Sequence, residues 1–413
     1  MKSIEEKKEE LMFKKLVSVL ALALVVTACA PTVKEEVSQG VTDTEILIAN
    51  CAATSGAFAP VGVPFIAGIQ AYLDVINEAG GIDGRQVKFL HEDDEFDPIK
   101  GKACLTKMVE DEQVFAIVGH FGTPVVGATL EDLKEYGIPA VYFATGIGQL
   151  YSDNATGRDR GIMPVQPIYR TEGQIMVARA VSLVDAKKIG IIYTNDDAGK
   201  DMLWGAQKKA QELGLELVEA QVAPGAADVS AAVTTIKEAN VDFIIGGAIQ
   251  ATIPTIIKEL AAQGNDKDVI TTYVNVSLAI AQTFAADAAG KFDVYGNGWV
   301  SFEGERAAEL AKFAEAAPDY AANAFAMTGW IAAHFFTEGL RRLAESGEVV
   351  NWENYMDAME AAPISNPFGG SIDFGNGKRA GTQEMNLSVV DVNEAGLWKV
   401  VDGLKSIEDL LGN

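Results

Sequence analysis

Three short loops of small residues each follow an apolar run that is typical of a buried strand. The loops are Thr54-Ser55-Gly56, Gly122-Thr123-Pro124 and Ala144-Thr145-Gly146. In a parallel sheet with helices on both faces, ligands bind beside the loops at the carboxyl ends of the strands. Small side chains leave backbone N–H groups free there, and the first turn of a helix favours an anion such as a carboxylate. The loops therefore predict a site for a small anionic group.

Residues next to these loops would complete the walls of a cleft. Phe58, Val61 and Phe121 could form the floor for an apolar ligand body. Two later loops, Tyr193-Thr194-Asn195-Asp196-Asp197 and Ala248-Ile249-Gln250, follow apolar runs in the same way. Any one of these loops alone could be routine, but together they predict a ligand cleft between two lobes.

Signatures of enzymes and metal sites are weak in this sequence. There is no Gly-x-Ser-x-Gly elbow, Walker loop or Gly-x-Gly-x-x-Gly stretch. His120 at a strand end could act as a base, but a structural role is the better interpretation. The run from His91 to Pro98 holds five carboxylates, yet it lacks the Asp/Gly spacing of a calcium loop and is better explained as a helix cap. We expect no enzyme activity, no cofactor and no metal centre.

The composition narrows the class of protein further. The 413 residues include 58 Asp and Glu against 33 Lys and Arg, a net charge of −25. A groove for nucleic acid needs clustered cations, so this balance argues against a nucleic-acid partner. None of the three Cys lies in a Cys-x-x-Cys pair, so we expect neither a thiolate zinc site nor a disulfide framework.

Strand and helix patterns alternate in two series that must position the loops. Apolar runs and helical periodicities predict β-α-β-α order before and after a Pro-rich joint at 163–167. The fold class is therefore α/β, with two doubly wound parallel-sheet lobes. In the first series the expected strands are 46–49, 87–90, 114–119 and 140–143, and one helix begins near Pro64. In the second series they are 188–193, 215–219, 243–246 and 269–273. The last third predicts a long helix at 319–346 and short strands at 369–374 and 387–392.

The amino terminus predicts export and a lipid anchor. Lys14 and Lys15 precede an apolar run at 16–26, which is too short to span a bilayer and fits a signal peptide of residues 1–28. The ending Val26-Thr27-Ala28-Cys29 resembles a bacterial lipobox, which implies acylation of Cys29 and a lipidated tether at 29–43. An ordinary signal peptide with a chance Cys is the alternative. Residues 1–11 do not fit a signal peptide, so the true start could be Met12.

Several stretches together resemble one protein family. They are Thr54-Ser55-Gly56 with Val61-Gly62, Asn77-Glu78-Ala79-Gly80-Gly81-Ile82-Asp83-Gly84-Arg85, Glu92-Asp93-Asp94 with Asp97-Pro98, Val118-Gly119-His120, Tyr136-Gly137-Ile138-Pro139 and Ala227-Asp228-Val229-Ser230. From about Thr44 onward, the chain resembles the solute-binding lipoproteins of ABC transporters that bind leucine, isoleucine and valine. The resemblance implies a type I periplasmic-binding-protein-like fold with a three-segment hinge. The expected first lobe is 44–164 plus about 304–384, and the second is about 165–303 plus 385–413.

The resemblance also implies where a ligand would bind. The family's contacts to the ligand carboxylate fall on Thr123, Ala144 and Gly146, with Thr145 able to supply the hydroxyl that Gly146 lacks. The family's two cleft tyrosines fall on Val61 and Ile249. Its acidic partner for the ligand ammonium should lie at 273–277, where Asn275 is polar but no acid is present. Asp196 or Asp197 could serve instead, or the ligand is not an α-amino acid.

The function implied is that of an extracytoplasmic solute-binding subunit of an ABC importer. It would bind a small amino acid or related carboxylate and deliver it to a permease driven by ATPase subunits, as a lipid-anchored monomer. Two alternatives stay open: a ligand-sensing receptor module of the same fold, and a binding protein for an amide, an aliphatic acid or an aromatic acid. A secreted hydrolase is disfavoured because the nucleophile motifs are missing.

Overall fold

The computed structural model of the protein describes residues 3, 4, 8, 12, 36–304 and 306–412. The described residues from Val37 onward form one compact unit. The apolar run at 16–26 and Cys29 lie outside the described residues, so the signal peptide and the lipid anchor stay predictions.

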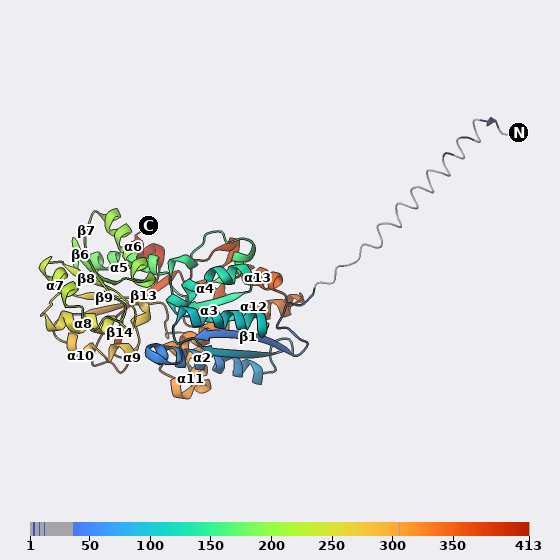
Figure 1. Cartoon of the computed structure of the whole chain (residues 1–413), viewed down its shortest axis with the longest axis horizontal. Helices are drawn as coiled ribbons and strands as arrows, with labels where there is room; N and C mark the ends of the chain where they lie inside the picture. Colours follow the sequence, from blue (N-terminus) through green and yellow to red (C-terminus); the bar gives the residue numbers. More distant parts are fainter. Residues whose placement is uncertain (1–2, 5–7, 9–11, 13–35, 305, 413) are drawn as a thin grey trace. The chain divides into compact units, whose positions relative to one another are not determined.

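The first sheet, in which β1 is labelled in Figure 1, contains five strands. They all run parallel, in the order β2-β1-β3-β4-β5. Strand β3 is buried along its whole length, as expected for a sheet that helices cover on both faces. The strands are β1 (Glu45–Ala52), β2 (Gln86–Asp93), β3 (Ala116–Phe121), β4 (Ala140–Ala144) and β5 (Ile162–Met163).

The second sheet has seven strands in the order β14-β13-β10-β9-β8-β6-β7. Five of them are parallel, whereas β13 runs antiparallel to β10 and β14 antiparallel to β13. The predicted parallel sheet is confirmed for these five strands, and β13 and β14 add an antiparallel edge to it. The short link between β13 and β14 can form a hairpin but not a crossover. The strands are β6 (Lys188–Thr194), β7 (Glu216–Val222), β8 (Phe243–Gly247), β9 (Val269–Thr271), β10 (Val294–Gly298), β13 (Glu384–Val390) and β14 (Trp398–Ser406).

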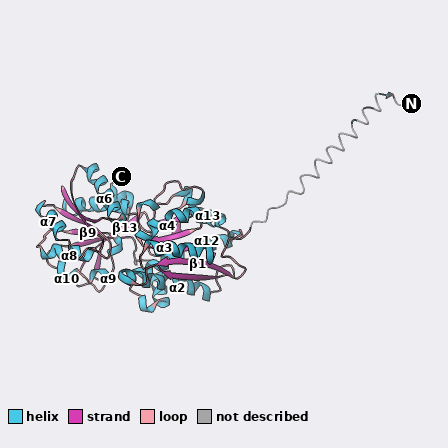
Figure 2. Cartoon of the chain, in the orientation of Figure 1, coloured by secondary structure: helices cyan, strands magenta, loops and turns pink. Residues whose placement is uncertain are grey.

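Helices cover both sheets (Figure 2). We call each sheet with its helices a lobe. Helix α12, from the last third of the chain, packs on α2, β3 and β4, so the chain returns to the first lobe after β10. The helices of the first lobe are α2 (Ala59–Glu78), α3 (Pro98–Thr106), α4 (Thr123–Tyr136), α11 (Arg306–Ala316), α12 (Ala324–Ser346) and α13 (Trp352–Glu360). Those of the second are α5 (Tyr169–Val184), α6 (Asp197–Leu213), α7 (Ser230–Glu238), α8 (Ile253–Ala262), α9 (Leu278–Ala281), α10 (Ala285–Ala288) and α14 (Ile407–Leu411).

One helical stretch among the described residues, Gly56–Glu78, is long and apolar enough to cross a membrane. Half of its most apolar window is buried inside the protein, and α2 packs against α12. We therefore treat it as a core helix of the first lobe.

The structure tests the predicted starts of two helices, α2 and α3. The prediction that α2 begins near Pro64 is wrong, because a 3-10 turn at Gly56–Phe58 leads directly into α2 at Ala59, with Pro60 in the first turn. Proline suits that position, since its missing N–H would be unpaired there anyway. The predicted cap of α3 is confirmed: the Asp97 carboxylate accepts bonds from two backbone N–H groups of the first turn, at 2.7 and 3.0 Å.

A disulfide joins Cys51 at the end of β1 to Cys104 in α3. Their Cα atoms are 6.2 Å apart, although 53 residues separate them along the chain. The expectation that the cysteines form no disulfide is therefore wrong. Spacing along the sequence could not reveal the pair, because the packing of α3 against β1 brings the two residues together.

Between the sheets the chain crosses three times: from β5 to α5, from β10 to α11, and from β12 (Ser371–Ile372) to β13. The crossings bond to one another. The Thr382 N–H donates to the Val165 carbonyl at 2.9 Å, and the Asn386 amide donates to the Val300 carbonyl at 2.6 Å. Closely bonded crossings are the natural place for a hinge.

Candidate functional site: an aromatic cavity between the lobes

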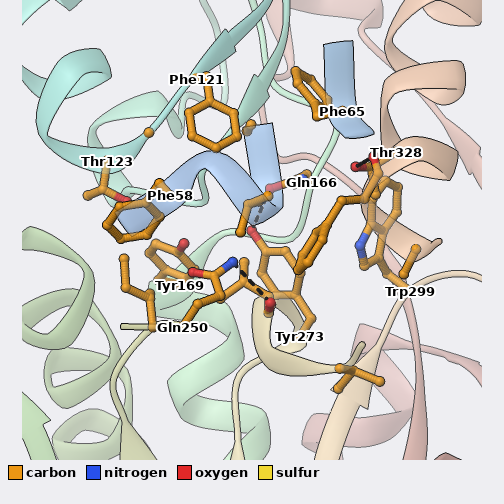
Figure 3. A pocket seen from close by; sticks show the side chains of 18 of the residues that line it. Phe58, Phe65, Phe121, Thr123, Gln166, Tyr169, Gln250, Tyr273, Trp299 and Thr328 are labelled. Atoms are coloured by element: carbon orange, nitrogen blue, oxygen red, sulfur yellow. Dashed lines mark hydrogen bonds between the residues drawn. The ribbon is translucent and has the colours of Figure 1, made fainter. Parts of the chain in front are cut away.

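The cavity lies where the carboxyl ends of both sheets face each other, and its volume is about 90 Å³ (Figure 3). Both lobes and the crossings contribute to its wall. The lining residues are Phe58, Val61, Phe65, Phe96, Phe121, Gly122, Thr123, Ala144, Ala324, Phe325 and Thr328 from the first lobe, Tyr169, Ile249, Gln250, Tyr273, Val274, Val276 and Gly298 from the second, and Gln166, Trp299 and Val300 from the crossings.

Stacked aromatic rings form the wall of the first lobe. The rings of Phe58 and Phe96 are parallel to within 14°, with centroids 3.7 Å apart, and Phe121 meets Phe96 edge-on at 6.2 Å. Phe96 holds a φ of +64°, which is rare for an aromatic residue. Its ring covers Gly122, where a Cβ atom would collide with it. This wall suits a flat or branched apolar group.

Three hydroxyl groups meet beside the first turn of α4. The Thr123 and Thr145 hydroxyls are 2.8 Å apart, and both also bond to the Tyr169 hydroxyl. Burial raises the pKa of Tyr169 to about 12, so its hydroxyl stays protonated at neutral pH. The N-cap of α4 is Gly122, which has no side chain to occupy the first N–H groups. Each hydroxyl has one hydrogen to donate, so a carboxylate here would accept from the Thr123 N–H and from a hydroxyl released from a bond within the cluster.

Gln166 connects the two lobes through its amide group. It donates to the Tyr142 hydroxyl of β4 at 2.6 Å. It also accepts from the Tyr273 hydroxyl at 3.0 Å (Figure 3). Burial raises the pKa of Tyr273 well above its usual range, so this hydroxyl also remains a donor. Because Gln166 lies on the first crossing and lines the cavity, it is positioned to link ligand contact with the hinge.

A buried carboxylate supports the wall of the second lobe from behind. Glu172 accepts bonds from the Tyr273 N–H at 2.8 Å, the Thr272 hydroxyl at 2.6 Å and the Asn297 amide at 3.1 Å. Burial raises the pKa of Glu172 to about 7. It does not line the cavity, so its role in the structure is to hold the 272–273 turn in place.

Seven of the residues predicted from sequence line the cavity together. Thr123 and Ala144 come from the loops of the first sheet and Gln250 from the second. The other four form apolar wall: Phe58, Val61, Phe121 and Ile249.

Two predicted loop residues lie just behind the lining. The Thr145 hydroxyl supports Thr123, with only 1 % of the Thr145 residue exposed. A Cβ at Gly146 would collide with the Pro167 carbonyl and lie 2.9 Å from the Tyr273 hydroxyl. The site therefore has no room for the threonine that the family resemblance implies at Gly146.

Three further predicted residues serve local structure instead. Ser55 is exposed and bonds to Asp93. Asp197 is exposed at the start of α6. Its carboxylate lies close to Gly127 of α4, 3.3 Å from the position that a Cβ atom on that glycine would take. Asn275 is buried and donates to the Ala248 carbonyl and the Thr271 hydroxyl. None of the three lines the cavity.

Asp196 is likewise engaged elsewhere. Its carboxylate caps α6 by accepting from the Gly199 N–H at 2.9 Å, and it also accepts from the Thr194 hydroxyl at 2.8 Å. Neither Asp196 nor Asp197 lines the cavity, so neither takes the place of the missing acidic residue at 273–277.

The acidic run at 91–98 bonds mostly to the protein itself. Asp93 accepts from the backbone N–H groups of Thr54 and Glu95, and Glu92 pairs with Lys107 at 2.5 Å. His120 is buried, bonds to Thr129 at 2.7 Å, and has its pKa lowered to about 4 by burial. It does not line the cavity.

Sequence reasoning missed the residues that reach the cavity from distant segments. Phe65 lies one helical turn beyond Val61, and its spacing gave a usable signal. Gln166, Trp299 and Phe325 come from the crossings and from α12, and no local pattern pointed to them.

Comparison with known proteins gives one family and one fold. The family model described as periplasmic binding protein matches residues 45–396. An amino acid binding protein of Pseudomonas aeruginosa is 25% identical over 224 residues, which cover 53% of this chain and 58% of that relative. Among solved structures, a fatty acid ABC transporter substrate-binding protein from Thermomonospora curvata aligns with a TM-score of 0.77 and 18% identity, covering 92% of this chain and 96% of that one. A branched-chain amino acid ABC transporter from Thermus thermophilus with bound valine aligns with a TM-score of 0.76 and 16% identity, covering 90% and 100%.

Proposed function

Because the chain belongs to the periplasmic binding protein family, we propose that it is the extracytoplasmic solute-binding subunit of an ABC importer. It binds a small amino acid or related carboxylate and delivers it to a permease whose ATPase subunits supply the energy. The ligand is bound and released unchanged, and the subunit acts as a monomer.

The observation that carries this proposal is the shared construction of the cavity. Thr123 and the phenylalanine wall belong to the first lobe, whereas Tyr169, Gln250 and Tyr273 belong to the second. A ligand that touches both walls binds the closed form better than the open form. Such a ligand therefore shifts the equilibrium between the open and closed forms, to an extent set by its difference in affinity for the two forms.

The hinge of this motion lies in the three crossings. We assign 44–164 plus about 304–384 to the first lobe, and about 165–303 plus 385–413 to the second. The Tyr142–Gln166–Tyr273 bonds join these lobes beside the cavity. Micromolar affinity requires about 8 kcal/mol in total, which a few hydrogen bonds and a buried apolar body can supply.

A ligand carboxylate would bind at the first turn of α4. The Thr123 N–H and hydroxyl, with Tyr169 beside them, are the donors that support this placement. The apolar body would then lie against Phe58, Phe96 and Phe121. The solved structures of the same fold include binders of a fatty acid and of valine, so the fold admits more than one class of carboxylate.

Replacing Thr123 by Val tests this placement. Since the change keeps the shape but removes a buried hydroxyl, we expect carboxylate affinity to fall by about 1–3 kcal/mol. Calorimetric titration measures the effect. Thr235→Val is the matched control, because Thr235 lies on the exposed face of α7 and bonds only locally. An unchanged affinity in Thr123→Val would remove this hydroxyl from the site.

We also propose that Cys29 is acylated after removal of residues 1–28, which anchors the protein to a membrane through residues 29–43. The lipobox resemblance and the family's location outside the cytoplasm support this. Cys29→Ser should move the protein from the membrane fraction to the soluble fraction, as measured by fractionation and immunoblotting. Persistent membrane association of the variant would contradict the anchor.

A further inference from the structure

The cavity wall has no ionic side chain among the described residues. Its polar lining side chains are hydroxyls, amides and an indole, from Thr123, Gln166, Tyr169, Gln250, Tyr273, Trp299 and Thr328. An α-amino acid would bring an ammonium group into this cavity. Burying that charge without a carboxylate partner is costly.

The buried carboxylates near the wall are not available as partners. Glu172 already accepts three bonds behind Tyr273. Asp94 is fully buried behind Phe96, whose N–H donates to one of its oxygens at 2.9 Å; its other oxygen has no partner among the described residues but is shut off from the cavity. Neither residue lines the cavity. An ammonium could reach them only if the wall itself moved.

A carboxylate, in contrast, would find hydrogen-bond donors at the start of α4. Thr123 is 95% buried, and its hydroxyl bonds to those of Thr145 and Tyr169 at the uncapped start of α4. Backbone N–H groups at a helix start stabilise an anion without a cationic side chain. For an amino acid, this cavity therefore offers hydrogen-bond donors to the carboxylate but no acidic partner to the ammonium group.

The size of the cavity limits the rest of the ligand. Its volume of about 90 Å³ is small and favours a compact ligand body. The stacked rings of Phe58 and Phe96 and the edge of Phe121 favour a branched or monocyclic group.

We propose that the ligand is a compact monocarboxylate with a branched aliphatic or aromatic body and no ammonium group. The inference rests on the proposed solute-binding function and specifies the ligand class of the same cavity. The carboxylate bonds at Thr123, and the body fills the space between Phe58, Phe121, Tyr273 and Trp299 (Figure 3).

Matched ligand pairs test the inference on the purified protein. Calorimetric titration compares 4-methylpentanoate with L-leucine and phenylacetate with L-phenylglycine; the members of each pair differ by the ammonium group alone. We expect at least one acid to bind about 100-fold or more tightly than its amino acid partner. An amino acid that binds as tightly as its matched acid overturns the inference. Tighter binding of the neutral 4-methylpentanamide than of 4-methylpentanoate overturns the carboxylate assignment.

A charge introduced into the wall gives a second test. Gln250 is half-buried and lines the cavity, so Gln250→Glu places a carboxylate where an ammonium could meet it. The ratio of acid to amino acid affinity should fall about tenfold or more. Gln221→Glu makes the same change on the exposed face of β7 and should leave the ratio unchanged. An unaltered ratio in Gln250→Glu contradicts the inference.

These outcomes separate the inference from the proposed function. If the amino acids bind and the acids do not, the ligand class is wrong but solute binding in this cavity stands. If no compound of either class binds, the inference fails. If, in addition, no compound in the wider screen described below stabilises the protein, the proposed function fails as well.

Discussion

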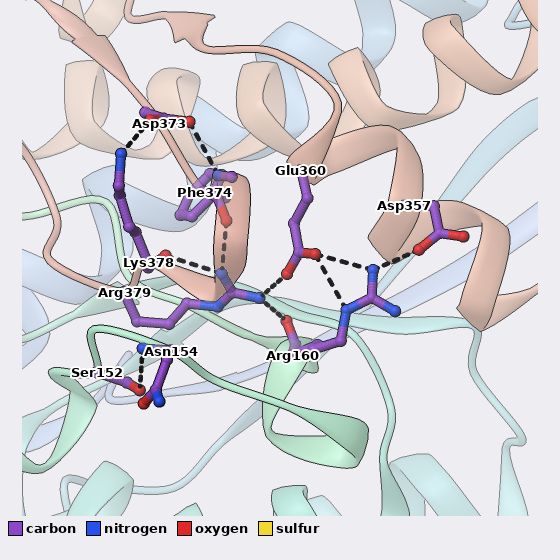
Figure 4. A network of polar contacts seen from close by, with 10 residues as sticks. Ser152, Asn154, Arg160, Asp357, Glu360, Asp373, Phe374, Lys378 and Arg379 are labelled. Carbon is purple, nitrogen blue, oxygen red and sulfur yellow. Dashed lines mark hydrogen bonds and ion pairs between the residues drawn. The ribbon is translucent and has the colours of Figure 1, made fainter.

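Replacing Arg379 by Leu should lower the free energy of unfolding by about 3–5 kcal/mol, the usual cost of removing one partner of a buried ion pair. Arg379 is only 1 % exposed. Its guanidinium donates to Glu360 at 2.5 Å and to the carbonyls of Arg160, Phe374 and Lys378 at 2.6, 3.1 and 2.8 Å (Figure 4). The change leaves three carbonyls without this donor and a carboxylate that retains only Arg160.

The position of Arg379 explains why its replacement should lower the stability of the fold. It lies on the third crossing, between β12 and β13, and ties that segment to the end of α13 and to the 157–161 turn. Urea denaturation measures the free energy. Lys378→Leu is the neighbouring control, because Lys378 makes an exposed ion pair with Asp373 that is worth about 1 kcal/mol or less. Equal losses in both variants would contradict the role assigned to Arg379.

Removing the disulfide should cost about 4 kcal/mol. The bond closes a loop of 53 residues between Cys51 and Cys104, and restriction of the unfolded chain grows with loop length. The double variant Cys51→Ala/Cys104→Ala should unfold at lower urea than the oxidised protein. Reductant should destabilise the natural protein but leave the double variant unchanged. Equal stability of oxidised protein and double variant would show that the bond contributes nothing.

Local patterns were sufficient for most of the fold. Apolar runs located the strands because buried parallel strands must be continuous in apolar residues, and Asp97 marked a helix start that the structure confirms. The expected strand at 387–392 overlaps β13, but no strand was expected at β14, because its residues are mostly exposed and form no buried apolar run. The start of α2 was missed because glycine and proline at 55–62 are also typical of loops.

The candidate site also contains some residues that could be predicted from the sequence and others that could not. Loops at strand ends are set by the fold class, so Thr123, Ala144 and Gln250 could be predicted to lie together. Residues such as Trp299 and Phe325 reach the cavity only through the crossings and α12. The disulfide and the Gln166 bonds depend on tertiary contacts that join distant segments, which no single-sequence spacing contains.

The central claim is that a small carboxylate binds in the cavity between the lobes. Thermal-shift screening of the purified protein against amino acids, amides, and aliphatic and aromatic acids tests it most directly. A ligand at about 100 times its dissociation constant should stabilise the protein by about 2.7 kcal/mol. The account predicts such a shift for at least one carboxylate, and a smaller shift at the same concentration in Thr123→Val. A screen in which no carboxylate shifts the protein, or in which Thr123→Val responds identically, would contradict it.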